Sequence, residues 1–371
     1  MFELLTYQQY WWFIVALLGG LFALMSFVQG GQTLLNTIAK GEDEKSIVIA
    51  SLGRKWELTF TTLVMFGGAL FAAFPLLYAV SFGGAYFVWM IILFCFIIQA
   101  VSYEYRLKPN NFLGQKTYET FLYINGSLGV FLIGVALATF FTGGNFIKNE
   151  MNLSSWVTPS YGLEALLNPF NIALGFTLFF LSRVGAALYF INNIEHKDIL
   201  KRTQRVLRVN AILFLLFFVT TTLFLLLLSG VEHSDGVFMV VEHKFLHNLL
   251  DLPLLIVTLL AGVLTVLYSF YISLFKGSDK GIWFYGLGVV VTITTILSLL
   301  GFNNTAIYPS LADLQSSLSI QNSSGSHYTL EVMSFVSLAI PFVLTYIYFV
   351  WRSMDREKIT EDEVLSDSHH Y

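Results

Sequence analysis

The sequence predicts an all-α membrane protein that crosses the bilayer many times. Hydrophobic residues make up 56% of its 371 residues, charged residues make up only 12%, and the mean hydropathy is +0.70. A typical soluble domain has about 25% charged residues. Apolar runs of about 20 residues, each long enough to cross a hydrocarbon core of about 30 Å, recur along the chain. Because backbone groups in lipid must pair with one another, these runs are predicted to be helices.

Nine apolar runs predict about nine spans in a single transmembrane domain of residues 1–351. The first run lacks the basic flank and small-residue cleavage site of a signal peptide, so it is predicted to be a true span. Pro341 falls inside the last run and predicts a kink there. The predicted spans cover residues 9–31, 57–80, 83–102, 117–142, 168–193, 206–229, 252–275, 280–302 and 328–351.

Lysine and arginine gather in alternate loops, which predicts the orientation. By the positive-inside rule, the N-terminus is expected outside and the C-terminus in the cytoplasm, which requires an odd number of spans. Residues 352–371 are then an acidic cytoplasmic tail, and their polar composition predicts disorder. The odd-numbered loops and the tail hold Lys40, Lys45, Arg54, Lys55, Arg106, Lys108, Lys116, Lys197, Lys201, Arg202, Arg205, Lys276, Lys280, Arg352, Arg356 and Lys358, against Lys148 and Lys244 in the even-numbered loops.

Two carboxylates bracket the second and third spans. Glu57 follows Trp56 at the start of one span, Glu104 ends the other, and the turn between them is predicted at Ser81-Phe82-Gly83-Gly84. A short hairpin returns both carboxylates to the cytoplasmic side, where Glu119 also begins the fourth span. Partly desolvated carboxylates can exchange protons at neutral pH, so the set predicts a proton-entry site. Solvated helix ends are the alternative, and the favoured one for Glu119 alone.

Arg183 is the one clear basic residue deep within a predicted span. Charged groups at this depth need a partner. An ion pair or an interhelical hydrogen bond is the favoured role for Arg183. Contact with a lipid head group or a quinone is the alternative.

No catalytic or metal-binding residue is predicted for this chain, and no nucleic-acid partner. The single cysteine, Cys95, lies in an apolar run and is interpreted as a buried free thiol. All histidines fall in predicted loops or the tail, so paired histidine ligation of haem between spans is excluded. The seven are His196, His233, His243, His247, His327, His369 and His370.

Residues 56–108 closely resemble subunit II of cytochrome bd-type quinol oxidases. In that family a Trp-acidic pair precedes a Gly-Gly-Ala-Leu-Phe-Ala-Ala-aromatic-Pro segment, and the hairpin ends in aromatic-acidic-Tyr-Arg. The matching residues here are Trp56-Glu57, Gly67–Pro75 and Tyr103-Glu104-Tyr105-Arg106. Further similarities are Trp11-Trp12, Leu167-Asn168-Pro169-Phe170, Tyr308-Pro309 and Thr329-Leu330-Glu331-Val332-Met333.

The resemblance implies a bacterial cytoplasmic-membrane heterodimer that oxidises quinol and reduces oxygen in aerobic respiration. In such a complex, subunit I holds haems b and d, and subunit II packs against it and helps supply protons. Small single-span accessory subunits and a bound quinone or lipid are also expected. The resemblance also implies that part of a proton pathway in this chain consists of Trp56, Glu57 and Glu104.

The chain departs from the family late in the first span. Many members carry an Asp-Gly-Phe-Asp-type stretch there, whereas this chain reads Ser26-Phe27-Val28-Gln29-Gly30-Gly31-Gln32, without an acid. A path through a span-one aspartate therefore does not carry over. A proton-coupled secondary transporter and a purely structural membrane subunit are the alternative functions. Matched pairs of broken helices, which a transporter would show, are not evident in the sequence.

Overall fold

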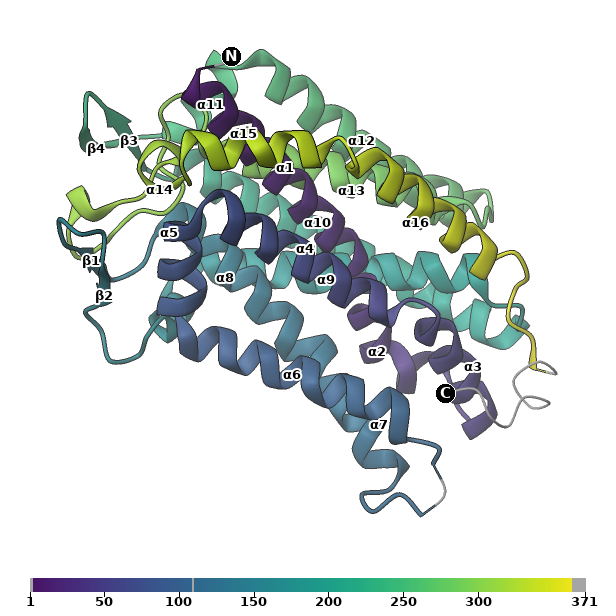
Figure 1. Ribbon diagram of the computed structural model, residues 1–371. Helices are drawn as coiled ribbons and strands as arrows, with labels where there is room; N and C mark the ends of the chain where they lie inside the picture. Colours follow the sequence, from purple (N-terminus) through teal and green to yellow (C-terminus); the bar gives the residue numbers. More distant parts are fainter. Residues whose placement is uncertain (1–2, 109, 362–371) are drawn as a thin grey trace.

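The computed structural model describes residues 3–108 and 110–361, which form a bundle of long helices with short loops at both ends (Figure 1). Within these residues eight helical segments are long and apolar enough to cross a membrane, and the apolar helix Gly281–Leu297 is shorter, with 17 residues. The all-helical membrane fold is therefore confirmed. The number of crossings and the orientation of the termini stay predictions.

The elements follow the predicted runs closely, with additions in the loops. The α-helices are α1 (Leu4–Met25), α2 (Phe27–Ile38), α3 (Glu42–Gly53), α4 (Trp56–Ala73), α5 (Pro75–Tyr78), α6 (Tyr86–Tyr105), α7 (Gln115–Ile124), α8 (Val130–Thr142), α9 (Pro169–Asn193), α10 (Lys197–Leu227), α11 (Lys244–Asp251), α12 (Pro253–Phe275), α13 (Gly281–Leu297), α14 (Ile320–Ser323), α15 (His327–Ser337) and α16 (Ile340–Met354). Two π-helices, η1 (Ala79–Gly84) and η2 (Asn125–Gly129), and two 3₁₀-helices, η3 (Leu163–Leu167) and η4 (Leu314–Ser316), complete the helical part.

Two small antiparallel hairpins lie in loops at one end of the bundle. Strand β1 (Phe146–Lys148) pairs with β2 (Ser154–Trp156), and β3 (Gly230–Ser234) pairs with β4 (Val237–Val241). Figure 1 shows both hairpins at the same end, next to α14. Sequence periodicity did not predict these short strands, because three to five residues carry too little pattern.

The first predicted span is longer than residues 9–31. Helices α1 and α2 together run from Leu4 to Ile38, with a break at Ser26, whose hydroxyl donates to the Ala23 carbonyl at 2.6 Å. The following segment, predicted as a loop, contains helix α3. Gln29, Gln32 and two glycines lower the hydropathy of α2, so its end was not evident from the apolar pattern.

Helix α2 lies at the centre of the bundle because its glycines allow close packing. A Cβ on Gly30 would lie 2.2 Å from the backbone of Ser182 in α9, and a Cβ on Gly126 in η2 would lie 2.2 Å from the Gln29 carbonyl. Small residues let helix backbones approach in membranes, where packing rather than water exclusion drives association. Any larger side chain at Gly30 would push α2 and α9 apart.

The predicted hairpin after α4 begins earlier than Ser81. Helix α4 ends at Ala73 because Pro75 follows, and the residue before proline, Phe74, leaves the helical region with φ −131° and ψ 64°. The predicted turn, residues 81–84, is part of the π-helix η1, and the chain bends at Ala85 before α6. Most of the connection is therefore helical, with breaks at Phe74 and Ala85.

The last apolar segment, His327–Met354, contains Pro341 and is divided directly before it, where the sequence predicted a kink. Helices α15 and α16 meet at Leu338–Ala339, and Pro341 lies in the first turn of α16, where its missing N–H is tolerated. Helix α15 begins at His327, one residue before the predicted span, so a histidine marks the end of this segment. Figure 1 shows α15 and α16 lying along the outside of the bundle.

The predicted disordered tail is wrong for its first ten residues, 352–361. Asp355, directly after α16, accepts hydrogen bonds from Lys55 Nζ (2.8 Å), Asn193 Nδ2 (3.0 Å) and Tyr189 OH (3.3 Å). The Lys55 side chain is fully buried and that of Asp355 is 5% exposed. Ile359 N then donates to the Asn193 carbonyl at 2.8 Å. We call residues 355–361 the C-terminal latch. Residues 362–371, also predicted to be disordered, lie outside the described residues.

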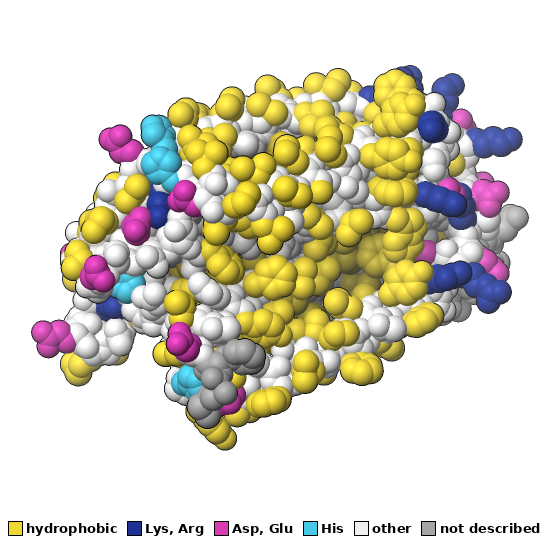
Figure 2. Space-filling model, turned by 90° about the horizontal axis from the view of Figure 1, so that it is seen from above, with side chains coloured by type: hydrophobic (Ala, Val, Ile, Leu, Met, Phe, Trp, Pro, Cys, Tyr) yellow, Lys and Arg dark blue, Asp and Glu magenta, His cyan; other side chains and the backbone are white. Residues whose placement is uncertain are grey.

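Charged side chains gather at the two ends of the molecule. Figure 2 shows a broad hydrophobic surface, with many Lys and Arg side chains at one end and many Asp, Glu and His side chains at the other. A hydrophobic belt between two polar ends is typical of a protein that spans a bilayer. The distribution agrees with the charge bias from which the orientation was predicted.

Candidate functional site

Trp56 and Tyr103 bring the ends of α4 and α6 together. Their rings stack with centroids 5.4 Å apart and an interplanar angle of 15°. Glu57 and Glu104 are the next residues on each helix, so the two carboxylates lie at the same end of the bundle on neighbouring helices. Glu57 also lies in the first turn of α4, where the helix dipole favours a negative charge.

Glu57 and Glu104 are exposed and do not contact each other within the described residues. Glu104 pairs with Lys108 one turn away at 3.1 Å, and both side chains are 56% exposed. An exposed pair of this kind contributes about 0–1 kcal/mol. The sequence predicted that these carboxylates are partly desolvated, but this chain alone leaves Glu57 and Glu104 exposed to solvent.

Both carboxylates end a stripe of exposed residues on their helix. On α4 the stripe is Glu57, Thr61, Val64, Gly68 and Phe71, at spacings of three and four residues. On α6 exposed residues follow the same periodicity, namely Phe87, Met90, Phe94, Ile97, Val101 and Glu104. A helix that packed on either stripe would cover the carboxylate at its end.

Glu119 differs from the expectation of a solvated helix-end carboxylate. Its side chain is only 5% exposed and binds Arg106, itself 2% exposed, through Nη2 at 2.8 Å and Nε at 3.1 Å. Lys45 contacts the other carboxylate oxygen at 2.8 Å, and Glu42 contacts Arg106 from the surface at 3.1 Å. The buried carboxylate of the set is therefore the one that the sequence favoured least, and two cations compensate it.

A file of uncharged polar side chains continues inward from this cluster, between α2 and α6. Gln32 Nε2 donates to Tyr103 OH at 3.2 Å, and one turn deeper Gln29 Nε2 donates to Gln99 Oε1 at 3.0 Å. Gln99, Tyr103 and Arg106 share one face of α6 because they are four and three residues apart. Asn125 of η2 is fully buried beside this file. We call Gln29, Gln32, Gln99, Tyr103 and Asn125 the amide file.

Several atoms of the amide file have no hydrogen-bond partner among the described residues. They are Gln29 Oε1, Gln32 Oε1, Gln99 Nε2 and both amide atoms of Asn125. Buried amide groups without partners cost free energy, so such groups are normally satisfied by internal water. Gln29 and Gln32 lie where the resemblance led us to expect acidic residues. Polar residues at helical spacing in apolar runs were the signal that could have revealed the file.

Arg183 takes the interhelical hydrogen bond that the sequence favoured. Its Nε donates to Asn210 Oδ1 of α10 at 2.8 Å, and the guanidinium carbon lies 5.3 Å from the centre of the Phe179 ring. No carboxylate lies within salt-bridge distance of it in the described part of the chain. Among the described residues, Arg183 therefore has a hydrogen-bond partner but no partner for an ion pair.

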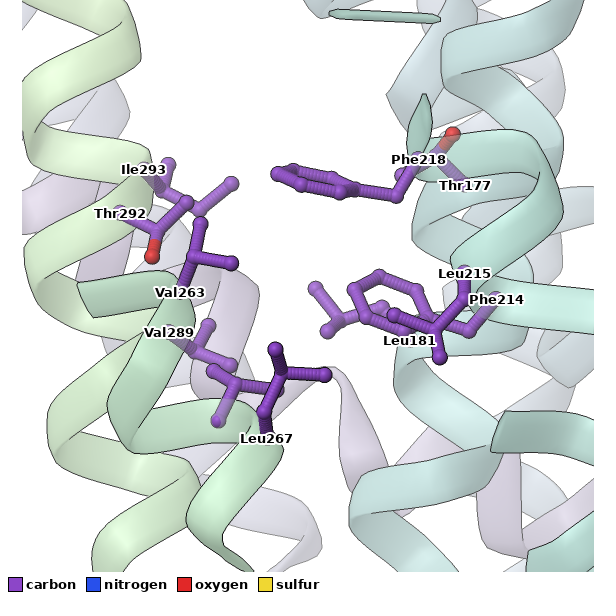
Figure 3. A pocket seen from close by; sticks show the side chains of 11 residues that line it. Thr177, Leu181, Phe214, Leu215, Phe218, Val263, Leu267, Val289, Thr292 and Ile293 are labelled. Carbon is purple, nitrogen blue, oxygen red and sulfur yellow. The ribbon is translucent and has the colours of Figure 1, made fainter. Parts of the chain in front are cut away.

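Figure 3 shows an apolar cavity between α9 and α10 on one side and α12 and α13 on the other. Its volume is about 40 Å³, and Thr177 and Thr292 supply the only hydroxyls on its wall. A space of this size holds little more than a water molecule.

A second cavity, of about 150 Å³, lies near the strand-bearing end and is lined by polar groups, including Glu164 and Tyr308. Burial alone would raise the pKa of Glu164, but hydrogen bonds from Ser160, Thr158, its backbone and Asn145 together hold it below the ordinary value. Burial raises the pKa of Tyr308 to about 12. Glu164 therefore stays ionised and fixes the loop before α9.

The described histidines do not form a metal site. Across residues 3–108 and 110–361, no group of three or more His, Cys, Asp or Glu side chains is placed to hold a metal ion. His247 lies in the short helix α11, His243 directly precedes it, and His327 begins α15 with its ring against Tyr7 at 5.3 Å. His369 and His370 lie outside the described residues.

The sequence is similar to one known family along nearly its whole length. The family model described as cytochrome bd terminal oxidase subunit II matches residues 7–354. The chain is 27% identical over 357 residues to the "Probable cytochrome oxidase subunit 2" of Haemophilus influenzae, covering 92% of each protein. It is 24% identical to the "Cytochrome bd-I ubiquinol oxidase subunit 2" of Escherichia coli, covering 97% of each.

Other relatives and a solved structure agree with this similarity. The "Cytochrome bd ubiquinol oxidase subunit 2" of Bacillus subtilis is 24% identical, over 92% of this chain and 95% of that protein. The fold is similar to a chain of the bd oxidase from Geobacillus thermodenitrificans, with a TM-score of 0.66 and 13% identity. That match covers 95% of this chain and all of the other.

Proposed function

The chain belongs to the cytochrome bd terminal oxidase subunit II family, and from this premise we propose that it is the haem-free subunit of a quinol:oxygen oxidoreductase. It is a multi-pass protein of the bacterial cytoplasmic membrane and one subunit of an oxidase complex. In our proposal it packs on the haem-bearing subunit I and helps supply cytoplasmic protons for the reduction of oxygen to water.

The exposed stripes of α4 and α6 support packing against a partner subunit. They border a groove of about 410 Å³ whose wall includes Phe60, Phe71, Trp89 and Phe96. Gly68 lies on the α4 stripe with no atom near the position of a Cβ. A small residue on an exposed apolar face permits close approach of another helix in a membrane. We propose that subunit I covers this surface and, with it, Glu57 and Glu104.

The amide file is the single observation that carries the proton-supply proposal. Its outer end is Tyr103, which stacks on Trp56 beside both exposed carboxylates, and its inner end is the Gln29–Gln99 pair with Asn125. Glu57 and Glu104, once desolvated by a partner, would collect protons at the cytoplasmic side. Water molecules bonded to the unpartnered amide atoms would carry protons inward, and no aspartate in the first span is needed for that.

The placement of histidine supports the haem-free role. The described histidines lie in loops, in the short helix α11 or at the first residue of α15. Haem between membrane helices needs axial ligands at bilayer depth, most often histidine. In this proposal haems b and d are held by subunit I. A quinone bound as a lipid and small single-span subunits are expected in the same complex.

The test uses the assembled complex with Glu57→Gln, Glu104→Gln and the double substitution. We expect the double variant to assemble normally and to consume oxygen with quinol more slowly per haem, because glutamine cannot bind and release a proton. The solvent isotope effect on turnover should rise if proton delivery becomes limiting. Glu150→Gln, at an exposed carboxylate between the two strands of the first hairpin, is the matched control and should leave turnover unchanged.

Full turnover in an assembled double variant would remove the proton-supply part and leave a purely structural subunit. Gln29→Leu and Gln99→Leu test the inner part of the path in the same assay. Slower turnover in these variants, but not in the glutamate variants, would place proton entry elsewhere, such as at Glu119. The amount of assembled complex is measured in every case, so that lost assembly is not mistaken for slow turnover.

A further inference from the structure

Arg183 is a membrane-embedded cation whose hydrogen-bonding capacity is mostly unused. Of its five N–H groups only Nε–H has a partner among the described residues, the Asn210 side chain at 2.8 Å. The residue is neither fully buried nor exposed, so its outer nitrogens can be reached from outside the bundle. A neutral amide and the Phe179 ring over which the guanidinium lies do not neutralise a full charge within a membrane.

The depth of Arg183 follows from the charges on α10. Arg208 is the last charged residue of this helix, and residues 209–227 carry none. Nineteen residues rise about 28 Å, close to the thickness of the hydrocarbon core. Arg183 contacts Asn210, two residues or about 3 Å beyond Arg208. Its guanidinium therefore lies close to the level at which lipid phosphate groups begin.

The surroundings of Arg183 suit a lipid rather than a polar small molecule. Toward the bilayer centre, Phe176 and Phe180 of α9 stack with Phe217 of α10, at centroid distances of 5.0 and 5.4 Å. Val209 is 53% exposed beside Asn210, and Tyr123 of α7 is 48% exposed. An apolar surface below a cation accommodates an acyl chain below a head group.

We propose that Arg183 binds the phosphodiester group of an anionic phospholipid at the cytoplasmic end of the α9–α10 surface. The planar guanidinium offers two parallel N–H groups, which match two phosphate oxygens. Arg205 and Arg208 are exposed on α10 nearby and favour a lipid of net negative charge. Asn210 positions the guanidinium by holding Nε. The lipid then supplies the counter-charge that no described residue supplies.

The experiment measures phospholipid retained by the purified complex after detergent washing, together with its quinone content. We expect the affinity for phosphatidylglycerol to fall by about tenfold or more in Arg183→Gln. This is the fold-change that corresponds to the loss of one or more charge-assisted hydrogen bonds. Arg183→Lys should retain it better than Arg183→Gln but less well than the natural residue. Lys116→Gln, an exposed cation on α7 at the same end, is the control and should not change retention.

Three results would overturn the proposal. Quinone lost from Arg183→Gln with phospholipid unchanged would assign the arginine to a quinone site. Unchanged phospholipid together with a lower melting temperature would leave only the structural bond to Asn210. Equal losses in the Lys116→Gln control would show a general surface-charge effect. If Arg183→Gln does not assemble, Arg183→Lys is used instead. Reduced phospholipid retention by Arg183→Lys then supports the proposal, whereas retention equal to that of the natural complex contradicts it.

Discussion

Glu119 and Arg106 form a buried ion pair whose strength depends on both partners being present. Glu119 also binds Lys45, whereas the remaining acidic contact of Arg106 is the 61% exposed Glu42. Removing one partner of a buried pair leaves the other charge desolvated and uncompensated, which costs about 3–5 kcal/mol. At the residue scale, this cluster therefore holds α3, α6 and α7 together at one end of the bundle.

We predict that Glu119→Gln lowers the melting temperature of the complex strongly, because Arg106 and Lys45 lose their shared carboxylate. Glu104→Gln provides a matched control, since it removes an exposed carboxylate from a pair worth about 0–1 kcal/mol. The two variants are compared by thermal unfolding at equal detergent and lipid content. Similar shifts for both would show that the cluster is not a structural anchor.

The three glutamates could not be ranked from the sequence. Glu57 and Glu104 lie next to the ends of α4 and α6, but burial depends on which side of each helix faces the bundle. Glu57 and Glu104 face outward, whereas Glu119 faces Arg106 and Lys45, two residues that the sequence placed in loops. The need of Arg183 for a partner was easier to predict from the sequence, because a charge in a long apolar run needs a partner however the helices pack.

The C-terminal latch is the main contact of α16 with the rest of the chain. Leu338, Phe342, Tyr346 and Phe349 are each more than 60% exposed, so the middle of this segment packs on little within the subunit. At its end, Lys55 lies over the rings of Tyr189 and Trp351, at 5.7 and 5.3 Å, and binds Asp355. The element is thus held by its ends rather than along its length.

At the element scale, we predict that Asp355→Asn releases the end of α16, since Lys55 would remain buried without its counter-charge. Hydrogen exchange should increase in residues 351–361, and proteases should cleave there sooner. Lys358→Gln is the control, because its 2.8 Å bond to Asp279 joins two side chains that are 39% and 43% exposed. Equal protection in both variants would mean that the backbone contacts of Ile359 alone hold the segment.

Helix boundaries were less predictable than helix existence. The pattern of apolar runs correctly predicted an all-helical bundle, whereas the break at Ser26, the π-helices η1 and η2 and the latch depend on tertiary packing. The acidic, polar composition of the tail predicted disorder, but a buried lysine offsets that tendency by binding Asp355. A single long-range partner of this kind leaves no local signal in the sequence.

At the scale of the whole molecule, the histidines in residues 3–108 and 110–361 lie near the ends of the bundle. His196 and His243 each directly precede a helix, His233 lies in strand β3, and His247 lies in α11. His327 begins α15 and faces Tyr7 and Glu331, the latter at 3.8 Å. None of these five is placed midway along a helix long enough to cross the membrane.

We predict that replacing His233, His243, His247 and His327 together by alanine leaves the haem absorbance of the assembled complex unchanged. Haem held between spans needs ligands at bilayer depth, and these side chains cannot reach it. The spectrum per complex is recorded in oxidised and reduced forms, with the amount of each subunit measured separately. As a second measurement, membranes containing this chain without subunit I should show no Soret band, whereas co-expression of both subunits restores it. A Soret band from this chain alone, in proportion to its amount, would reverse the assignment of haem to the partner.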